Sequence, residues 1–317
     1  MPEARRSPGS PTVRRRELGA KLRALRNEQG LTVDQVAAEL LCSPSKVSRM
    51  ETGQRGATLR DIRDLCDLYG VVEAADRERL STLAREGKQQ GWWQSYNLDF
   101  ATYVGLEEAA VSLSFYMPML IPGLLQTPGY VRALHEADMQ NYTPERVEEA
   151  VEVRLKRQQI LTRNPPLQLS VVLDEAVLHR VVGGPAVMGE QLDRLITAGN
   201  LENVTISIIP FTVGAHPAMD SLFEILDFGD TAQQVVYVEG LMGYIYLDRA
   251  QDISRYVQVF DHLRSLALTP EESAGLIAKI RAQYKSVTLS IANVTDDLGC
   301  DTLEGGKLLN GSLSYTE

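Results

Sequence analysis

The sequence predicts two domains of different class: an all-α head of five helices, followed by an α/β domain in which helices pack on a mixed sheet. Apolar residues recur at helical spacing through residues 16–85, and strand-like apolar runs alternate with helical segments further along. A chain of 317 residues that is 44% hydrophobic can build two cores. Residues 1–90 contain 17 Lys and Arg against 13 Asp and Glu, whereas the remainder contains 15 against 29. The patterns therefore indicate a basic head on an acidic body.

Composition divides the chain into four segments. Residues 1–15 are rich in Pro, Ser and Arg, which predicts a disordered basic arm. The arm is either a solvated tail or a segment that touches phosphates or a minor groove. Residues 16–86 form the helical head, which ends where the sequence KQQG interrupts the helical pattern. Residues 87–285 form the α/β domain, and residues 286–317 form a polar tail with little pattern.

Three of the five head helices are predicted from their apolar faces alone. The first covers Arg16–Glu28, with leucines on one face and Gly30 as its end. The last two cover Leu59–Tyr69 and Glu73–Arg85, where apolar residues again recur at helical spacing. These helices provide a scaffold for the pair that lies between them.

The middle pair, residues 31–55 (LTVDQVAAELLCSPSKVSRMETGQR), is the most informative stretch of the chain. Thr32 and Gln35 have capping-box spacing at the start of one helix. After a short break, Ser43 caps the next helix and Pro44 occupies its first position. Two short helices with a buried seam and a polar outer face suit the major groove of double-stranded DNA.

The polar face of the second helix of this pair supplies the candidate DNA contacts. Base reading requires donors that reach base edges from the groove, and we expect these contacts from Ser45, Lys46 and Arg49. Groups at the neighbouring helix ends suit phosphates: Thr32, Ser43, Gln54 and Arg55. A merely solvated helix face is the alternative, which the surrounding helix-turn-helix pattern disfavours.

The second domain shows strands and helices in alternation. A long charged helix is expected at Glu145–Leu161 and a shorter one at Gln191–Ala198, with two more at Ile253–Leu266 and Glu271–Tyr284. Strands are expected at Leu167–Leu173, Val204–Pro210, Ser221–Phe228 and Gln234–Glu239. The aromatic and Pro-rich stretch Trp92–Gln126 either makes an inter-domain or dimer contact or completes the core of this domain.

Carboxylates at strand ends are candidates for a ligand pocket, because pockets in α/β domains form there. The candidates are Asp174, Glu175 and Glu239, together with His216 and Asp220 from a loop; ordinary loop roles are the alternative. The chain contains no HExxH and no GxSxG motif. We therefore expect that the protein is not an enzyme and that it binds no metal and no cofactor. Three dispersed cysteines indicate the cytoplasm, and no apolar run is long enough for a membrane span.

Residues 16–85 resemble the XRE/Cro-type helix-turn-helix regulators in the sequences LRALRNEQGLT, VAAEL and SPSKVSRMETGQR. The resemblance implies that the second helix of the middle pair reads the major groove and that the protein is a homodimer on a two-fold site. It also implies a partly exposed ion pair between Arg26 and Glu51. One departure is Leu41, which stands where glycine is common, and a left-handed conformation there would cost about 1 kcal/mol.

Residues 91–284 resemble the effector-type domain that follows this head in many actinobacterial regulators. The matching sequences include YVGLEEAA, YMPMLIPGLLQTPGYVRAL, VRLKRQQIL and GAHPAMDSLFEILDF. The domain is called antitoxin-like because many members are encoded beside a small partner protein. The resemblance implies a transcriptional regulator whose second domain binds such a partner.

Together these observations predict a sequence-specific DNA-binding transcriptional regulator. Two alternatives concern the second domain. It could sense a small molecule, or it could be an enzyme that the DNA-binding head localises to a particular DNA site. A deep pocket with buried polar side chains around His216 and Asp174 would favour a sensor or an enzyme. A flat apolar surface would favour a protein partner.

Overall fold

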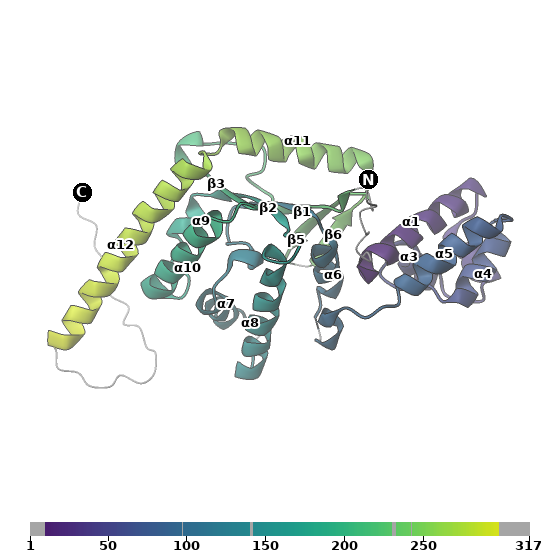
Figure 1. Ribbon diagram of the computed structural model, residues 1–317, viewed down its shortest axis with the longest axis horizontal. Helices are drawn as coiled ribbons and strands as arrows, with labels where there is room; N and C mark the ends of the chain where they lie inside the picture. The colour runs from purple at the N-terminus through teal and green to yellow at the C-terminus, as the bar shows by residue number, and fades with distance from the viewer. Residues whose placement is uncertain (1–9, 97, 140–141, 230–232, 242, 298–317) are drawn as a thin grey trace.

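The computed structural model describes residues 10–96, 98–139, 142–229, 233–241 and 243–297. Figure 1 shows a helical head at one end, a sheet flanked by helices in the middle and one long helix at the other end. The arrangement confirms the predicted all-α head and the α/β domain with a mixed sheet.

Five helices form the head: α1 (Pro11–Glu28), α2 (Val33–Glu39), α3 (Pro44–Glu51), α4 (Leu59–Leu68) and α5 (Ala74–Glu86). Their apolar faces meet in one core that includes Leu22, Val36, Val47, Met50 and Ile62. The capping box at Thr32 and the Ser43 cap are both formed, so the predicted starts of α2 and α3 are confirmed.

The first helix begins earlier than the sequence indicated. Ser10 caps α1 and Pro11 occupies its first turn, so residues 10–15 do not belong to a disordered arm. The physical reason is tertiary, since Val13 packs in the core of the second domain. Residues 1–9 of the predicted arm lie outside the described residues.

The second domain is built on a six-stranded sheet with the order β3-β2-β1-β4-β5-β6. Strands β1, β2 and β3 are parallel, whereas β4, β5 and β6 are antiparallel. The strands are β1 (Ser112–Met117), β2 (Gln168–Asp174), β3 (Val204–Ile209), β4 (Phe223–Asp227), β5 (Val235–Gly240) and β6 (Gly243–Leu247). The four predicted strands are present, and β1 and β6 are additional.

Helices cover both faces of this sheet (Figure 1). The helices are α6 (Ala101–Ala109), α7 (Pro128–Glu136), α8 (Pro144–Gln158), α9 (Ala176–His179), α10 (Gly184–Gly199), α11 (Ala250–Leu266) and α12 (Pro270–Asp297). Short 3-10 turns lie at η1 (Trp92–Ser95), η2 (Gly123–Leu125), η3 (Gln159–Leu161) and η4 (Phe211–Val213).

The side chains of each strand alternate between the two faces. Phe115, Val171 and Tyr237 point to the face that packs against α6 and α10. Tyr116 and Val236 point to the other face, which α11 covers with Phe260 and Leu263. The domain therefore has two apolar layers, one on each side of the sheet.

The last helix is longer than predicted. It runs to Asp297, so the first part of the segment assigned to a polar tail is helical. Its start packs on α10 and β3, with Ile277 and Ile280 buried in the larger core. Residues 298–317 of the predicted tail lie outside the described residues.

The aromatic stretch Trp92–Gln126 completes the core of the second domain. Trp93, Tyr103 and Phe115 are buried in the larger core, and Tyr116 is buried beneath α11. These four rings pack within the chain's own core, whereas Trp92, Tyr96 and Phe100 of the same stretch are only half-buried, so a dimer contact through the stretch stays a prediction. The oligomeric state itself stays a prediction.

The two domains touch through the first turn of α1 and the helix α6. The Ser10 hydroxyl donates a hydrogen bond of 2.6 Å to the Gly105 carbonyl. Gly105 has no room for a β-carbon, because Thr12 and Trp93 pack directly against it. One turn further along α1, Arg16 pairs with Asp248 at 3.2 Å and lies over the Tyr246 ring. The start of α1 is thus fixed to the second domain at two places.

The turn between α2 and α3 holds Leu41 in the left-handed region, with φ of 49° and the side chain 94% exposed. Leu41→Gly is expected to stabilise the head by about 1 kcal/mol, because glycine adopts this conformation without the steric cost. Chemical denaturation followed by far-UV circular dichroism measures the change. A loss of stability would show that Leu41 makes a contact that outweighs its backbone strain.

Candidate functional site

The outer face of α3 carries the exposed polar residues predicted for base reading. Val47 and Met50 are buried against the head core, which turns Ser45, Ser48 and Arg49 toward solvent. The Arg49 Nε donates to the Ser45 carbonyl at 3.2 Å, so the guanidinium lies along the helix surface. The predicted exposure of Ser45 and Arg49 is confirmed, and their contact with bases stays a prediction.

Lys46 differs from the outward orientation expected of it. Its Nζ lies 2.6 Å from Asp61 Oδ1, and the side chain is half-buried between α3 and α4. Burial by itself raises the pKa of Asp61, but hydrogen bonds from Lys46 and Thr58 outweigh burial and lower that pKa. Lys46 would have to give up this ion pair to reach a base, so Ser45 and Arg49 are the stronger candidates.

The four residues predicted to contact phosphate are exposed at helix ends. Thr32 and Ser43 accept backbone N–H groups at the starts of α2 and α3, which leaves each hydroxyl hydrogen available for a phosphate oxygen. Gln54 and Arg55 follow the end of α3. They flank the outer face of α3, as groups that clamp a DNA backbone must.

An ion pair joins the end of α3 to α1. Arg26 meets Glu51 with a fork of two hydrogen bonds, 2.6 Å from Nε to Oε1 and 2.9 Å from Nη2 to Oε2. The predicted pair is therefore confirmed. It is more buried than expected, since the side chains of Arg26 and Glu51 are 13% and 5% exposed. Arg26 also donates to the Leu31 carbonyl, which fixes the start of α2.

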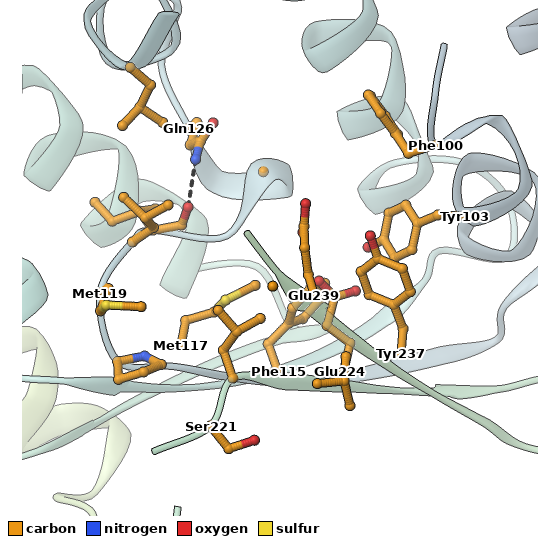
Figure 2. Close-up of a pocket in the computed structure, with 18 of the residues that line it drawn as sticks. Phe100, Tyr103, Phe115, Met117, Met119, Gln126, Ser221, Glu224, Tyr237 and Glu239 are labelled. Carbon is orange, nitrogen blue, oxygen red and sulfur yellow. Dashed lines mark hydrogen bonds between the residues drawn. The ribbon is translucent and has the colours of Figure 1, made fainter. Parts of the chain in front are cut away.

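A cavity of about 810 Å³ lies in the second domain, between the sheet and the helices α6 and α8. Cross-strand register places Phe115, Glu224 and Tyr237 side by side on the sheet surface that lines it. Figure 2 shows Glu224, Tyr237 and Glu239 entering the cavity from the sheet, with Tyr103 beside Tyr237. The cavity has the size of small-molecule sites in other proteins.

Arg157, which lines this cavity, belongs to a buried ion pair. Arg157 of α8 and Glu107 of α6 make two parallel hydrogen bonds of 2.7 Å. Their side chains are only 6% and 1% exposed. Tyr103 donates a further hydrogen bond of 3.0 Å to Glu107 Oε1. A forked pair with this extra donor satisfies the carboxylate and holds α6 against α8.

The guanidinium of Arg154 and two buried oxygens at the cavity lack hydrogen-bond partners among the described residues. Arg154 lines the cavity and forms no ion pair or hydrogen bond with another described residue. Oε2 of Glu224 and Oε1 of Gln126 are buried without a hydrogen bond. Burial raises the pKa of Glu224 to about 8, with a further contribution from the charge of Glu107. Burial, with the charge of Arg157, lowers the pKa of Arg154 to about 10.

The structure separates the five residues predicted to line a pocket. Asp220 and Glu239 line the cavity near its exposed rim. Asp174, Glu175 and His216 do not line it, so the five residues do not share this cavity. The physical reason lies in backbone caps and strand alternation. Asp174 caps Ala176, Glu175 accepts from Phe211, and His216 contacts Tyr116, which points to the α11 face.

Comparison with known families assigns both parts of the chain. Residues 100–279 match a family described as a domain of unknown function, DUF5753, which is more than half of the chain. The chain belongs to the DUF5753 family. Residues 17–80 match a helix-turn-helix domain, which supports a DNA-binding transcriptional regulator. The cavity lies entirely in the DUF5753 domain, and the exposed face of α3 lies in the helix-turn-helix domain.

No curated protein and no solved structure matches the chain. The function of the DUF5753 domain must therefore be argued from its own residues. Within the described part of the chain, none of the helices has both the length and the hydropathy to cross a bilayer.

Proposed function

We propose that this protein is a sequence-specific transcriptional regulator that reads the major groove with the outer face of α3. The observation that carries the proposal is the geometry of that face: Ser45 and Arg49 are exposed between cap hydroxyls on one side and Gln54 and Arg55 on the other. A groove-reading helix needs base-edge donors at its centre and phosphate contacts at its margins.

We further propose that the DUF5753 domain controls this head by binding an effector, without chemical turnover. The support is the position of α6, which contributes both to the cavity and to the contact with the head. Tyr103 of α6 lines the cavity, and Gly105, half a turn further on, packs against the first turn of α1. A ligand that favours one position of α6 would shift the equilibrium between orientations of α1.

A small protein partner is a second candidate for the effector. Four large apolar side chains are exposed around the cavity: Met119, Leu120, Met219 and Leu241. Exposed apolar side chains grouped in this way are typical of interaction surfaces. The resemblance to antitoxin-like domains implies the same kind of partner, and purification of the tagged protein from its own cells tests it. A stoichiometric small protein released by Leu241→Asp would favour the partner over a small molecule.

Arg49→Ala is the direct test of the reading face. Loss of a bidentate contact to guanine is expected to weaken specific binding by roughly 1–3 kcal/mol and to relax the preference at one base pair. Selection of bound sequences from a random DNA library gives both the site and the preference. Arg55→Ala is the matched control, because loss of a phosphate contact should weaken binding to all sequences alike and reduce its salt dependence. Unchanged affinity and preference in Arg49→Ala would mean that α3 does not read the groove in this way.

A further inference from the structure

We propose that the cavity of the DUF5753 domain binds an apolar organic acid, whose acid group pairs with Arg154 and whose hydrocarbon body fills the space above the sheet. This inference rests on the proposed role of the domain in binding an effector. It goes beyond that role because it names the chemistry of the ligand.

The first argument is that the guanidinium of Arg154 has no directly paired counterion, since Glu107 and Glu239 act on it only from a longer distance. The guanidinium lines the cavity, and its Nη1 packs against Gly123, where a β-carbon would overlap it. No carboxylate among the described residues forms an ion pair with it. A half-buried guanidinium without a directly paired counterion is unfavourable, and a bound carboxylate supplies that counterion in forked geometry.

Neither of the buried carboxyl groups near Arg154 serves as its counterion. Glu107 is already saturated by Arg157 and Tyr103. Glu224, with a pKa raised to about 8, is protonated at neutral pH and is therefore a hydrogen-bond donor. A protonated carboxyl next to a bound carboxylate donates to it, so Glu224 adds to the recognition of an acid.

The second argument is the apolar character of the remaining walls. Phe115 and Met117 line the cavity from β1, Leu120 and Ile121 from the following segment, and Leu134 from α7. Methionine adapts its shape to irregular ligands, and a volume of about 810 Å³ exceeds what a simple anion such as phosphate requires. The walls therefore favour an acid with a substantial hydrocarbon body.

Two acidic residues at the rim do not oppose this conclusion. Asp220 and Glu239 are exposed, so water and salt screen their repulsion of a bound acid. Arg154 is half-buried in the cavity, where its attraction is less screened than at the exposed rim. A carboxylate that passes the rim is therefore stabilised inside.

The cavity predicts a specific dependence on pH. Above pH 8 Glu224 becomes an anion and repels the bound carboxylate, whereas Arg154, with a pKa of about 10, is still largely charged at pH 9. The other charged and titratable groups that face Glu224 are Glu107 and Tyr103 of α6, Arg157 of α8, Glu239 and Tyr237 of β5, and Tyr246 of β6. If only the protonated form of Glu224 accepts the acid, affinity falls by roughly tenfold between pH 7 and pH 9.

The test uses the full-length protein and decanoate as the probe. Binding is measured as displacement of the fluorescent anion 8-anilinonaphthalene-1-sulfonate by decanoate, with decan-1-ol and decylamine as neutral and cationic probes of the same length. We expect decanoate to bind at least tenfold more tightly than either. Arg154→Met should remove this preference, while Arg146→Met, an exposed arginine on the same helix α8, should retain it. Circular dichroism confirms the fold of each variant.

A second variant keeps the test decisive if Arg154→Met does not fold. Glu224→Gln retains a hydrogen-bond donor that does not titrate, so decanoate should bind it without the loss between pH 7 and pH 9 seen in the unmodified protein. Equal binding of decanoate and decan-1-ol, or no displacement by millimolar decanoate, would overturn the proposal. DNA affinity is measured separately with and without decanoate. An acid that binds as described but leaves DNA affinity unchanged would refute control of the head and support the acid site.

Discussion

Arg157→Met is expected to destabilise the DUF5753 domain by about 3–5 kcal/mol, because it leaves the carboxylate of Glu107 charged and buried without its partner. The methionine fills most of the space of the arginine stem, so the lost pairing dominates the effect. Urea unfolding followed by tryptophan fluorescence measures it. The chain has two tryptophans, Trp92 and Trp93, and Trp93 is buried in the core of this domain.

The chain contains a matched control for this prediction. Arg132 and Glu148 form a fork of the same kind, with hydrogen bonds of 2.6 and 2.9 Å, but their side chains are 42% and 59% exposed. Arg132→Met should therefore cost no more than about 1 kcal/mol. Equal losses in the two variants would mean that burial does not set the strength of these pairs. Adding Glu107→Leu to Arg157→Met should recover most of the lost stability.

Arg26→Met is expected to destabilise the head by about 3 kcal/mol, since it leaves Glu51 buried without its forked partner. The same change releases the end of α3 from α1, so specific DNA binding should weaken although residue 26 lies away from the proposed reading face. The helix-turn-helix match, residues 17–80, contains no tryptophan, so far-UV circular dichroism is the appropriate measure of unfolding.

Arg23→Met is the control for Arg26→Met, because Arg23 approaches the same carboxylate from the more exposed side. Its Nε lies 3.9 Å from Glu51 Oε2, beyond hydrogen-bond distance, and its Nη2 donates a long hydrogen bond of 3.3 Å to the Glu51 backbone carbonyl. The expected loss is no more than about 1 kcal/mol. If Arg23→Met were as destabilising as Arg26→Met, the fork would not be the source of the stability.

The head could be predicted from the sequence because its signals are local. Caps such as Thr32 and Ser43 and the helical spacing of the leucines act within a few residues. The buried strands β2 and β3 were predictable for the same reason, as short apolar runs. Strand β1 was missed because it lies in an aromatic stretch broken by prolines, and β6 because its sequence GYIYL is largely exposed at the sheet edge.

The cavity depends on contacts between distant segments, which explains why most of its charged residues were missed. In the sequence, Arg154 and Arg157 look like part of the solvated face of a charged helix. Their partners and neighbours lie about 50 residues or more away, on α6 and β4. Glu224 carried one usable signal, as an isolated charge inside the apolar strand FEILD. A lone carboxylate in a buried strand is rarely without a function or a partner.

The continuous helix α1 belongs to both cores, with Val13 packed in the second domain and Leu22 in the head. From Val13 to Arg26 it forms a rigid lever about 20 Å long, at a rise of 1.5 Å per residue. A tilt of about 10° about its first turn would displace Arg26, and with it the end of α3, by roughly 3.4 Å, the rise of one base pair. A tilt of α1 of this size would convert a small movement of α6 into a shift of α3 by one base pair along the DNA.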